Sequence, residues 1–189
     1  MDWNEVKDVG RVAFNVFSPG ELETATGLTA DLQRVWRRRG HLPAREGART
    51  SFDAREAAAI AVRLELARFG VAPSETMELG EAAAATVLHS ALLSRSSAAE
   101  VRGAFDRMAQ VAASFAEDDR IATAVTGADG SGRYLWGQVP SQFEFADDIA
   151  PIISKDRIAA MLVLDLTVIG VRLADRAPKP LFLIDVRAG

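Results

Sequence analysis

A short helix, a glycine and a second helix follow one another closely in the segment Phe17–Ala54, and this order restricts how the segment can pack. Ser18 can cap the first helix with its side chain, and Pro19 suits the first helical position because it has no N–H group to satisfy. Gly27 is expected to end that helix, since glycine adopts the left-handed conformation found at many helix ends. Thr29 can then cap the second helix. We therefore predict two helices joined by a tight turn.

The second helix is predicted over residues 28–39, and its side chains divide between an apolar and a polar face at about 100° per residue. The apolar set expected to face the core is Leu28, Leu32, Val35 and Trp36. The opposite face carries Ala30, Gln33, Arg34 and Arg37, with Thr29 and Arg38 at its margins. Guanidinium and amide groups reach phosphate oxygens and base edges well, so this face predicts contact with DNA. Arg39 falls on the apolar side, where its stem is expected to cover the core.

Positive charge is concentrated around this helix. Between Gly27 and Arg55 there are seven arginines and three acidic residues, a local balance of +4, whereas the whole chain carries a net charge of −4. A basic module in an acidic protein is typical of a surface that binds a polyanion. The alternative is that Arg37, Arg38 and Arg39 simply end a helix, where the helix dipole favours cations without any partner.

Several spaced residues between Phe17 and about Val71 form a recognisable pattern: Gly27, Arg34, Trp36, Gly40, Pro43, Arg49 and Phe52. With this pattern, the N-terminal third of the chain resembles the winged helix-turn-helix of the MerR family of bacterial regulators. The sequence departs from the family where Gln33 replaces a leucine, where Val35 replaces a tyrosine, and in the later position of Phe52. The resemblance implies that the second helix lies in the major groove of DNA.

The segment His41–Phe52 is predicted to form the wing beside this helix. Pro43 and Gly47 can turn the chain there, and Arg45 and Arg49 can project from it. Arginines on a wing typically grip phosphates or enter the minor groove, so they position the module more than they select a sequence. The alternative is a surface loop without a binding role.

A longer helix is predicted over residues 54–69, because Asp53 can cap it and the segment is rich in good helix formers. Its apolar residues are too many for one face, so it should pack against more than one partner. Gly70 is expected to end it. We predict a DNA-binding domain over residues 1–73 and a second domain over residues 74–189.

The second domain is predicted to begin with two helices, at about 74–94 and 97–116. In proteins similar to MerR, helices in this region make the dimer contact. Ile121–Thr126 and Tyr134–Val139 are prone to form strands on either side of a turn rich in glycine, which predicts a hairpin.

A buried helix is predicted over Ser154–Arg176, since Ser154 can cap it and apolar residues cover nearly its whole circumference. A strand over Met161–Leu173 is the alternative. The helix would lie beneath the hairpin and the final apolar run Pro180–Val186, or between two subunits. Overall, the pattern predicts a mainly α protein with a small β component, that is, an α+β fold.

Several kinds of chemistry are not indicated. The chain has no cysteine and only two histidines, His41 and His89, so no metal site is expected, and His89 fits a buried structural role. No nucleotide fingerprint is present and no nucleophile is paired with a base, so neither a cofactor nor an enzymatic activity is expected. Four aromatic residues of the second half would line a ligand pocket or simply fill the core: Tyr134, Trp136, Phe143 and Phe145.

Together these features predict a homodimeric transcriptional regulator of bacterial or phage type that binds a palindromic operator in double-stranded DNA. We expect it in the cytoplasm with the nucleoid, because no leader or lipidation motif is evident and no membrane role is indicated. RNA polymerase, or a small-molecule or protein effector, would be a further partner. Two alternatives stay open: a phage-type architectural, packaging or excision protein that binds DNA, and an adaptor whose basic helix meets an acidic protein.

Overall fold

The computed structural model describes residues 9–42, 51–103, 108, 111, 119–128, 132–138, 142–154 and 160–186. The helices are α1 (Pro19–Thr26), α2 (Ala30–Arg38), α3 (Ala54–Arg68), α4 (Met77–Ser94), α6 (Asp119–Thr126), α7 (Ala150–Ile153) and α8 (Leu166–Arg176). The strands are β1 (Val9–Phe14), β2 (Val16–Phe17), β3 (Phe52–Asp53), β4 (Ala99–Arg102), β5 (Tyr134–Gln138), β6 (Gln142–Ala146), β7 (Leu162–Asp165) and β8 (Phe182–Val186). The predicted mixture of helices and small sheets is thus confirmed.

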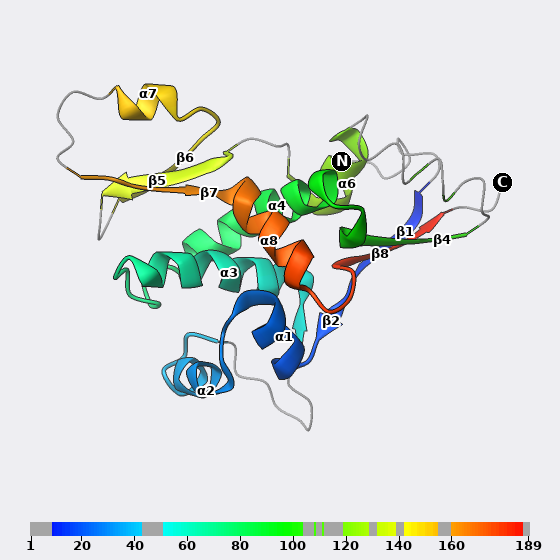
Figure 1. Ribbon diagram of the computed structural model, residues 1–189, viewed down its shortest axis with the longest axis horizontal. Helices are drawn as coiled ribbons and strands as arrows, with labels where there is room; N and C mark the ends of the chain where they lie inside the picture. The colour runs from blue at the N-terminus through cyan, green and yellow to red at the C-terminus, as the bar shows by residue number, and fades with distance from the viewer. Residues whose placement is uncertain are drawn as a thin grey trace.

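Helices α3, α4 and α8 cross at the centre of the molecule, and small sheets lie on either side of them (Figure 1). In one three-stranded sheet, β8 lies between β1, to which it is antiparallel, and β4, to which it is parallel. In the other, β5 lies between β6 and β7 and is antiparallel to both. Strands β2 and β3 form a separate short pair beside α1.

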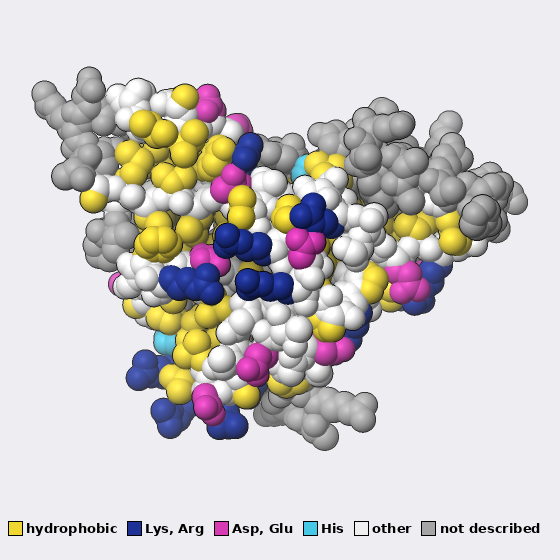
Figure 2. Space-filling model, in the orientation of Figure 1, with side chains coloured by type: hydrophobic (Ala, Val, Ile, Leu, Met, Phe, Trp, Pro, Cys, Tyr) yellow, Lys and Arg dark blue, Asp and Glu magenta, His cyan; other side chains and the backbone are white. Residues whose placement is uncertain are grey.

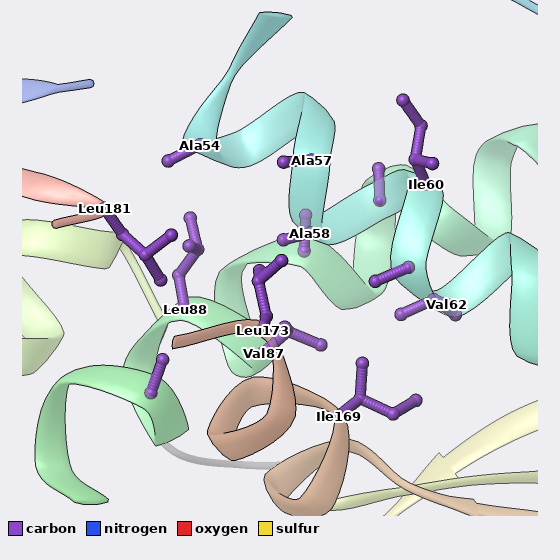
Figure 3. Close-up of a cluster of buried hydrophobic side chains, with 14 of the residues drawn as sticks. Ala54, Ala57, Ala58, Ile60, Val62, Val87, Leu88, Ile169, Leu173 and Leu181 are labelled. Atoms are coloured by element: carbon purple, nitrogen blue, oxygen red, sulfur yellow. The ribbon is translucent and has the colours of Figure 1, made fainter. Parts of the chain in front are cut away.

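The central helices approach closely because small residues line their contacts. Ala57 and Ala58 of α3 are fully buried, and Figure 3 shows them in a cluster that also contains Val87 of α4 and Leu173 of α8. On α8, a Cβ at Gly170 would lie 2.3 Å from the carbonyl oxygen of Val87, so only glycine permits this separation from α4. The expectation that the third helix packs on several partners is confirmed, since α3 contacts α1, α4 and α8.

The predicted start of the helical pair is also confirmed. Ser18 caps α1 in a capping box, in which its hydroxyl accepts from the backbone of Glu21 and the Glu21 carboxylate accepts from the backbone of Ser18. Gly27 ends α1 with φ +84°, and Thr29 caps α2 by accepting from the Leu32 N–H.

The predicted hairpin is wrong in its first arm, because residues 119–126 form helix α6. The buried side chains of Ala122 and Val125, spaced as on one helical face, pack toward α4, and this burial outweighs the strand preference of isoleucine, valine and threonine. The hairpin that does form joins β5 to β6.

The helix expected over residues 97–116 is also wrong at its start. A short 3-10 turn, Ser96–Ala98, leads into strand β4, which pairs with β8. The partner strand lies about eighty residues away in sequence, so no local pattern around residue 100 could reveal it.

The single helix expected over Ser154–Arg176 is wrong as well. Residues 162–165 form β7, in which buried and half-buried side chains alternate, and α8 begins only after it. Asp165 caps α8, since its Oδ1 accepts from Thr167 N at 2.9 Å and Val168 N at 3.4 Å. Ser154 ends α7.

The two predicted domains pack directly against each other. Helix α8 contacts α1 and α3, and β8 pairs with β1. Asn15 N donates to Leu181 O at 2.9 Å, and the Asn15 side chain donates to Pro180 O at 2.7 Å. Among the described residues, no helix combines the length and apolar character needed to cross a membrane.

Candidate nucleic-acid interface

Helix α2 lies at the periphery of the molecule, below α3 and beside α1 in Figure 1. Trp36 anchors it, with a side chain that is 3% exposed. The Arg63 guanidinium of α3 stacks over the Trp36 ring, 4.7 Å from its centroid, and donates to Pro73 O at 3.2 Å. Burial lowers the pKa of Arg63, although an arginine still remains charged. A buried cation and an aromatic ring thus fix the inner side of α2.

The structure corrects the expected place of Gln33. Its side chain is only 2% exposed, and its Nε2 donates to Pro19 O and to Leu28 O, both at 2.8 Å. Helix α1 and the turn cover this side of α2, so the amide satisfies two carbonyl groups instead of facing solvent. Gln33 therefore does not lie on the outer face of α2.

The outer face of α2 is formed by exposed arginines. Arg34 and Arg38 are exposed, and Arg34 Nη1 lies 2.6 Å from Asp31 Oδ1. Both partners of this ion pair are largely in water, with side chains 73% and 86% exposed, so the pair contributes little to stability. Arg34 can therefore leave Asp31 for another anionic partner. Figure 2 shows Lys and Arg side chains gathered at the edge of the molecule where α2 lies in Figure 1.

The remaining predicted residues of α2 lie around this face. Thr29 is exposed and acts as the helix cap. Arg37 is half-buried, and its Nη2 atom is shielded from solvent without a hydrogen-bond partner among the described residues. Arg39 is exposed, contrary to the expectation that its stem covers the core. Arg34, Arg37, Arg38 and Arg39 together form the α2 arginine face.

The predicted wing falls largely outside the described residues. Arg45 and Arg49 lie in that part of the chain. Where the structure resumes, β3 pairs with β2, with Phe52 opposite Phe17, and both rings are almost fully buried. The chain therefore returns to the start of α1 after residues 43–50.

A contact that the sequence did not reveal joins the C-terminal part of the chain to α1. Lys179 Nζ lies 2.9 Å from Glu21 Oε1 and 5.3 Å from the centroid of the Phe17 ring. The hydrogen bonds from Lys179 and from the Ser18 backbone lower the pKa of Glu21 to about 2. The sequence signal for Glu21 was only an acid in the first helical turn, which gave no hint of a lysine 158 positions away.

Several arginines elsewhere on the described surface are paired with acids. Arg68 pairs with Glu65 at 2.8 Å, Arg95 with Asp175 at 2.6 Å and Arg133 with Asp165 at 2.7 Å. Figure 2 shows Lys and Arg side chains and acidic side chains interspersed across the middle of this view. The α2 arginine face differs, because one acid, Asp31, is paired with it in the described structure while four cations share it.

The second half contains a cavity of about 580 Å³ between α4, α6 and the end of β6. Of the four aromatic residues considered from the sequence, Phe145 lines it. His89 of α4 is buried, 4% exposed, and its Nε2 lies 3.4 Å from Oγ1 of Thr123, a residue of the cavity lining. No cluster of three or more histidine or acidic side chains is placed to hold a metal ion in the described part of the chain.

Comparison with known proteins gives no match: no family model, no curated protein and no solved structure is significantly similar to the chain.

Proposed function

We propose that the protein is a DNA-binding transcriptional regulator that acts as a homodimer and places α2 in the major groove of a palindromic operator. The observation that carries the proposal is the α2 arginine face. It presents cations to solvent on a helix whose other side is fixed by Trp36 and Gln33. A rigid, cationic helix at the edge of an acidic protein has the charge and shape that a duplex requires.

The structure changes the assignment of roles within α2. Arg34, Arg38 and Arg39 are the side chains that can reach phosphates or base edges, since all three are exposed. Gln33 lies on the inner side of α2, where it hydrogen-bonds to Pro19 and Leu28. In this proposal Arg45 and Arg49 of the wing contact flanking phosphates, as the resemblance to the MerR family implies.

The test is a titration of the protein with duplex DNA at increasing salt. A dimer that neutralises about 6 to 10 phosphates should lose on the order of 10³ to 10⁵ in affinity between roughly 50 and 200 mM salt. Fluorescence anisotropy of a labelled duplex measures this directly. Absence of duplex binding at both salt concentrations would refute the proposal and favour an adaptor that meets an acidic protein.

Substitutions locate the interface. Arg34→Ala and Arg38→Ala should each weaken duplex binding. Each should also reduce the slope of log affinity against log salt concentration by about 1 for each phosphate contact removed. Arg172→Ala is the matched control, because Arg172 is an exposed arginine, 55% exposed, on α8 instead of α2. Equal losses for all three variants would place the contact elsewhere.

Mapping of the bound sites in the cell separates regulation from the architectural and packaging alternatives. A regulator should occupy discrete palindromic sites near promoters. An architectural or packaging protein should instead occupy the ends of phage genomes or long stretches of DNA. The second pattern would retain DNA binding and overturn the regulatory part of the proposal.

A further inference from the structure

The cavity between α4, α6 and β6 has the size of a small-molecule site, since such sites usually enclose about 300–1,000 Å³. Its volume is about 580 Å³. Its lining is made mostly of small side chains and glycine, which leave room for a ligand. The lining includes Ala82 and Ala85 of α4, Thr123, Gly127, Phe145 and Asp147.

The electrostatics of the cavity favour a positive charge. Asp147 is the charged side chain of the described lining, which contains no lysine or arginine. Its Oδ1 accepts a hydrogen bond from Gly132 N, which holds an otherwise exposed carboxylate in place. Thr123 and Gly127 also bring the C-terminal end of α6 to the wall, and the C-terminus of a helix carries partial negative charge.

The rest of the wall suits an apolar ligand body. Phe145 leaves 41% of its side chain exposed, so one aromatic surface is open to contact. Ala82 and Ala85 form the α4 side. An aromatic ring beside a carboxylate attracts an organic cation by two routes, apolar contact and the cation–π interaction.

We propose that this cavity binds a small organic cation, an amine or amidine carried on an aromatic or aliphatic body. The ammonium group lies against Asp147, and the body packs on Phe145 and the alanines of α4. The proposal is independent of DNA binding, because it rests on none of the residues of the α2 arginine face.

A charge series of three probes of similar shape tests the proposal: phenethylammonium, 2-phenylethanol and phenylacetate. Titration of the full chain, followed by amide NMR, should show the tightest binding for the ammonium and the weakest for the carboxylate. The shifts should occur at the cavity amides, such as those of Ala82, Gly127 and Gly132. Equal binding of the three probes, shifts confined to other amides, or no saturable ammonium binding would overturn the proposal.

Two variants and a control complete the test. Asp147→Asn keeps the acceptor for Gly132 N but removes the charge, and should weaken ammonium binding by about tenfold while leaving 2-phenylethanol unaffected. Asp148→Asn, an exposed neighbour that accepts from Ala150 N, should leave both affinities unchanged. Ala82→Phe, at an exposed position of α4, should fill the cavity and abolish binding of both probes. An ammonium affinity unaltered in Asp147→Asn or in Ala82→Phe would contradict the assigned site.

Discussion

Gln33 keeps a polar side chain where water does not reach, and it does so by donating both amide hydrogens to backbone carbonyls. One carbonyl belongs to Pro19 at the start of α1 and the other to Leu28 in the turn. Buried carbonyl groups that lose their donors cost free energy, so this one side chain ties three local segments together.

Gln33→Ala is therefore expected to lower the free energy of unfolding by about 2 kcal/mol, because the buried carbonyl of Leu28 and the partly buried carbonyl of Pro19 each lose a donor. Urea denaturation followed by circular dichroism measures the change. Arg34→Ala provides the exposed control on the same helix and should change stability by less than about 0.5 kcal/mol. A Gln33→Ala variant as stable as the parent would show that the amide is not structural.

Glu21 should make stability depend on pH in the acid range. Its pKa in the folded protein is about 2, below the ordinary value of 4.5, so the carboxylate stabilises the fold fully above about pH 4.5. That contribution is lost as the pH falls toward 2. Glu21→Gln keeps the capping hydrogen bond but removes the titration.

The parent should therefore lose more stability than Glu21→Gln between about pH 7 and about pH 3, as measured by urea midpoints. Lys179→Met removes the main cause of the lowered pKa and should also reduce the acid sensitivity. Parallel losses in all three proteins would show that the Lys179 contact does not hold this carboxylate.

At the scale of the elements, the sequence predicted what local signals determine. Ser18, Gly27, Thr29 and Asp53 act as the caps and the turn that their residue types indicate, so α1, α2 and α3 begin or end close to the predicted positions. Strand β4 was missed, and β7 was expected only as an alternative to a helix, because their partners, β8 and β5, are distant in the chain. Strand formation there depends on tertiary pairing that no short window contains.

The candidate site shows the same division at finer detail. The helix, its cap and its arginines could be predicted, but which side of α2 faces the rest of the protein could not. The buried side of α2 is set by how α1 packs against it, and this packing buries Gln33 while leaving Arg39 exposed. Periodicity alone centres the buried face on the most apolar residues and overlooks an amide that finds two acceptors.

Adding one methyl group to α8 at Gly170 is predicted to disrupt its contact with α4. In Gly170→Ala the new Cβ would lie 2.3 Å from Val87 O, so the helices must separate, and stability should fall by about 3 kcal/mol. Gly20→Ala is the matched control, since no atom lies within 4 Å of its Cβ position in α1. Thermal denaturation should show a large drop in Tm for Gly170→Ala only, and a similar Tm for both variants would contradict the close approach.

At the scale of the whole molecule, the described buried residues form a hydrophobic cluster that includes both predicted domains. Leu22 and Ala57 of the first part and Leu173 and Leu181 of the second are members of it. Pairing of β1 with β8 adds backbone hydrogen bonds across the same division. The boundary near residue 73 therefore divides two parts that stabilise each other.

We accordingly predict that the full chain unfolds in one cooperative transition and that a fragment of residues 1–73 does not fold alone. The fragment would expose the face of α3 that α4 and α8 cover. Amide NMR of the fragment should show the narrow dispersion of an unfolded chain. A well-dispersed spectrum, or two separate transitions in the full chain, would indicate independent domains.

The Arg63 side chain contacts two other helices: its guanidinium stacks on the ring of Trp36 in α2, and its aliphatic stem passes α4 where a Cβ at Gly80 would lie 2.7 Å from Arg63 Cγ. Further along α4, Ala82 and Ala85 line the cavity. If the two proposals hold, an organic cation bound against α4 and a duplex bound against α2 would both act on helices that Arg63 contacts. By thermodynamic linkage, if the cation changes the affinity for the duplex by some factor, the duplex must change the affinity for the cation by the same factor. Titrating the cation with and without duplex, and the duplex with and without cation, measures this coupling.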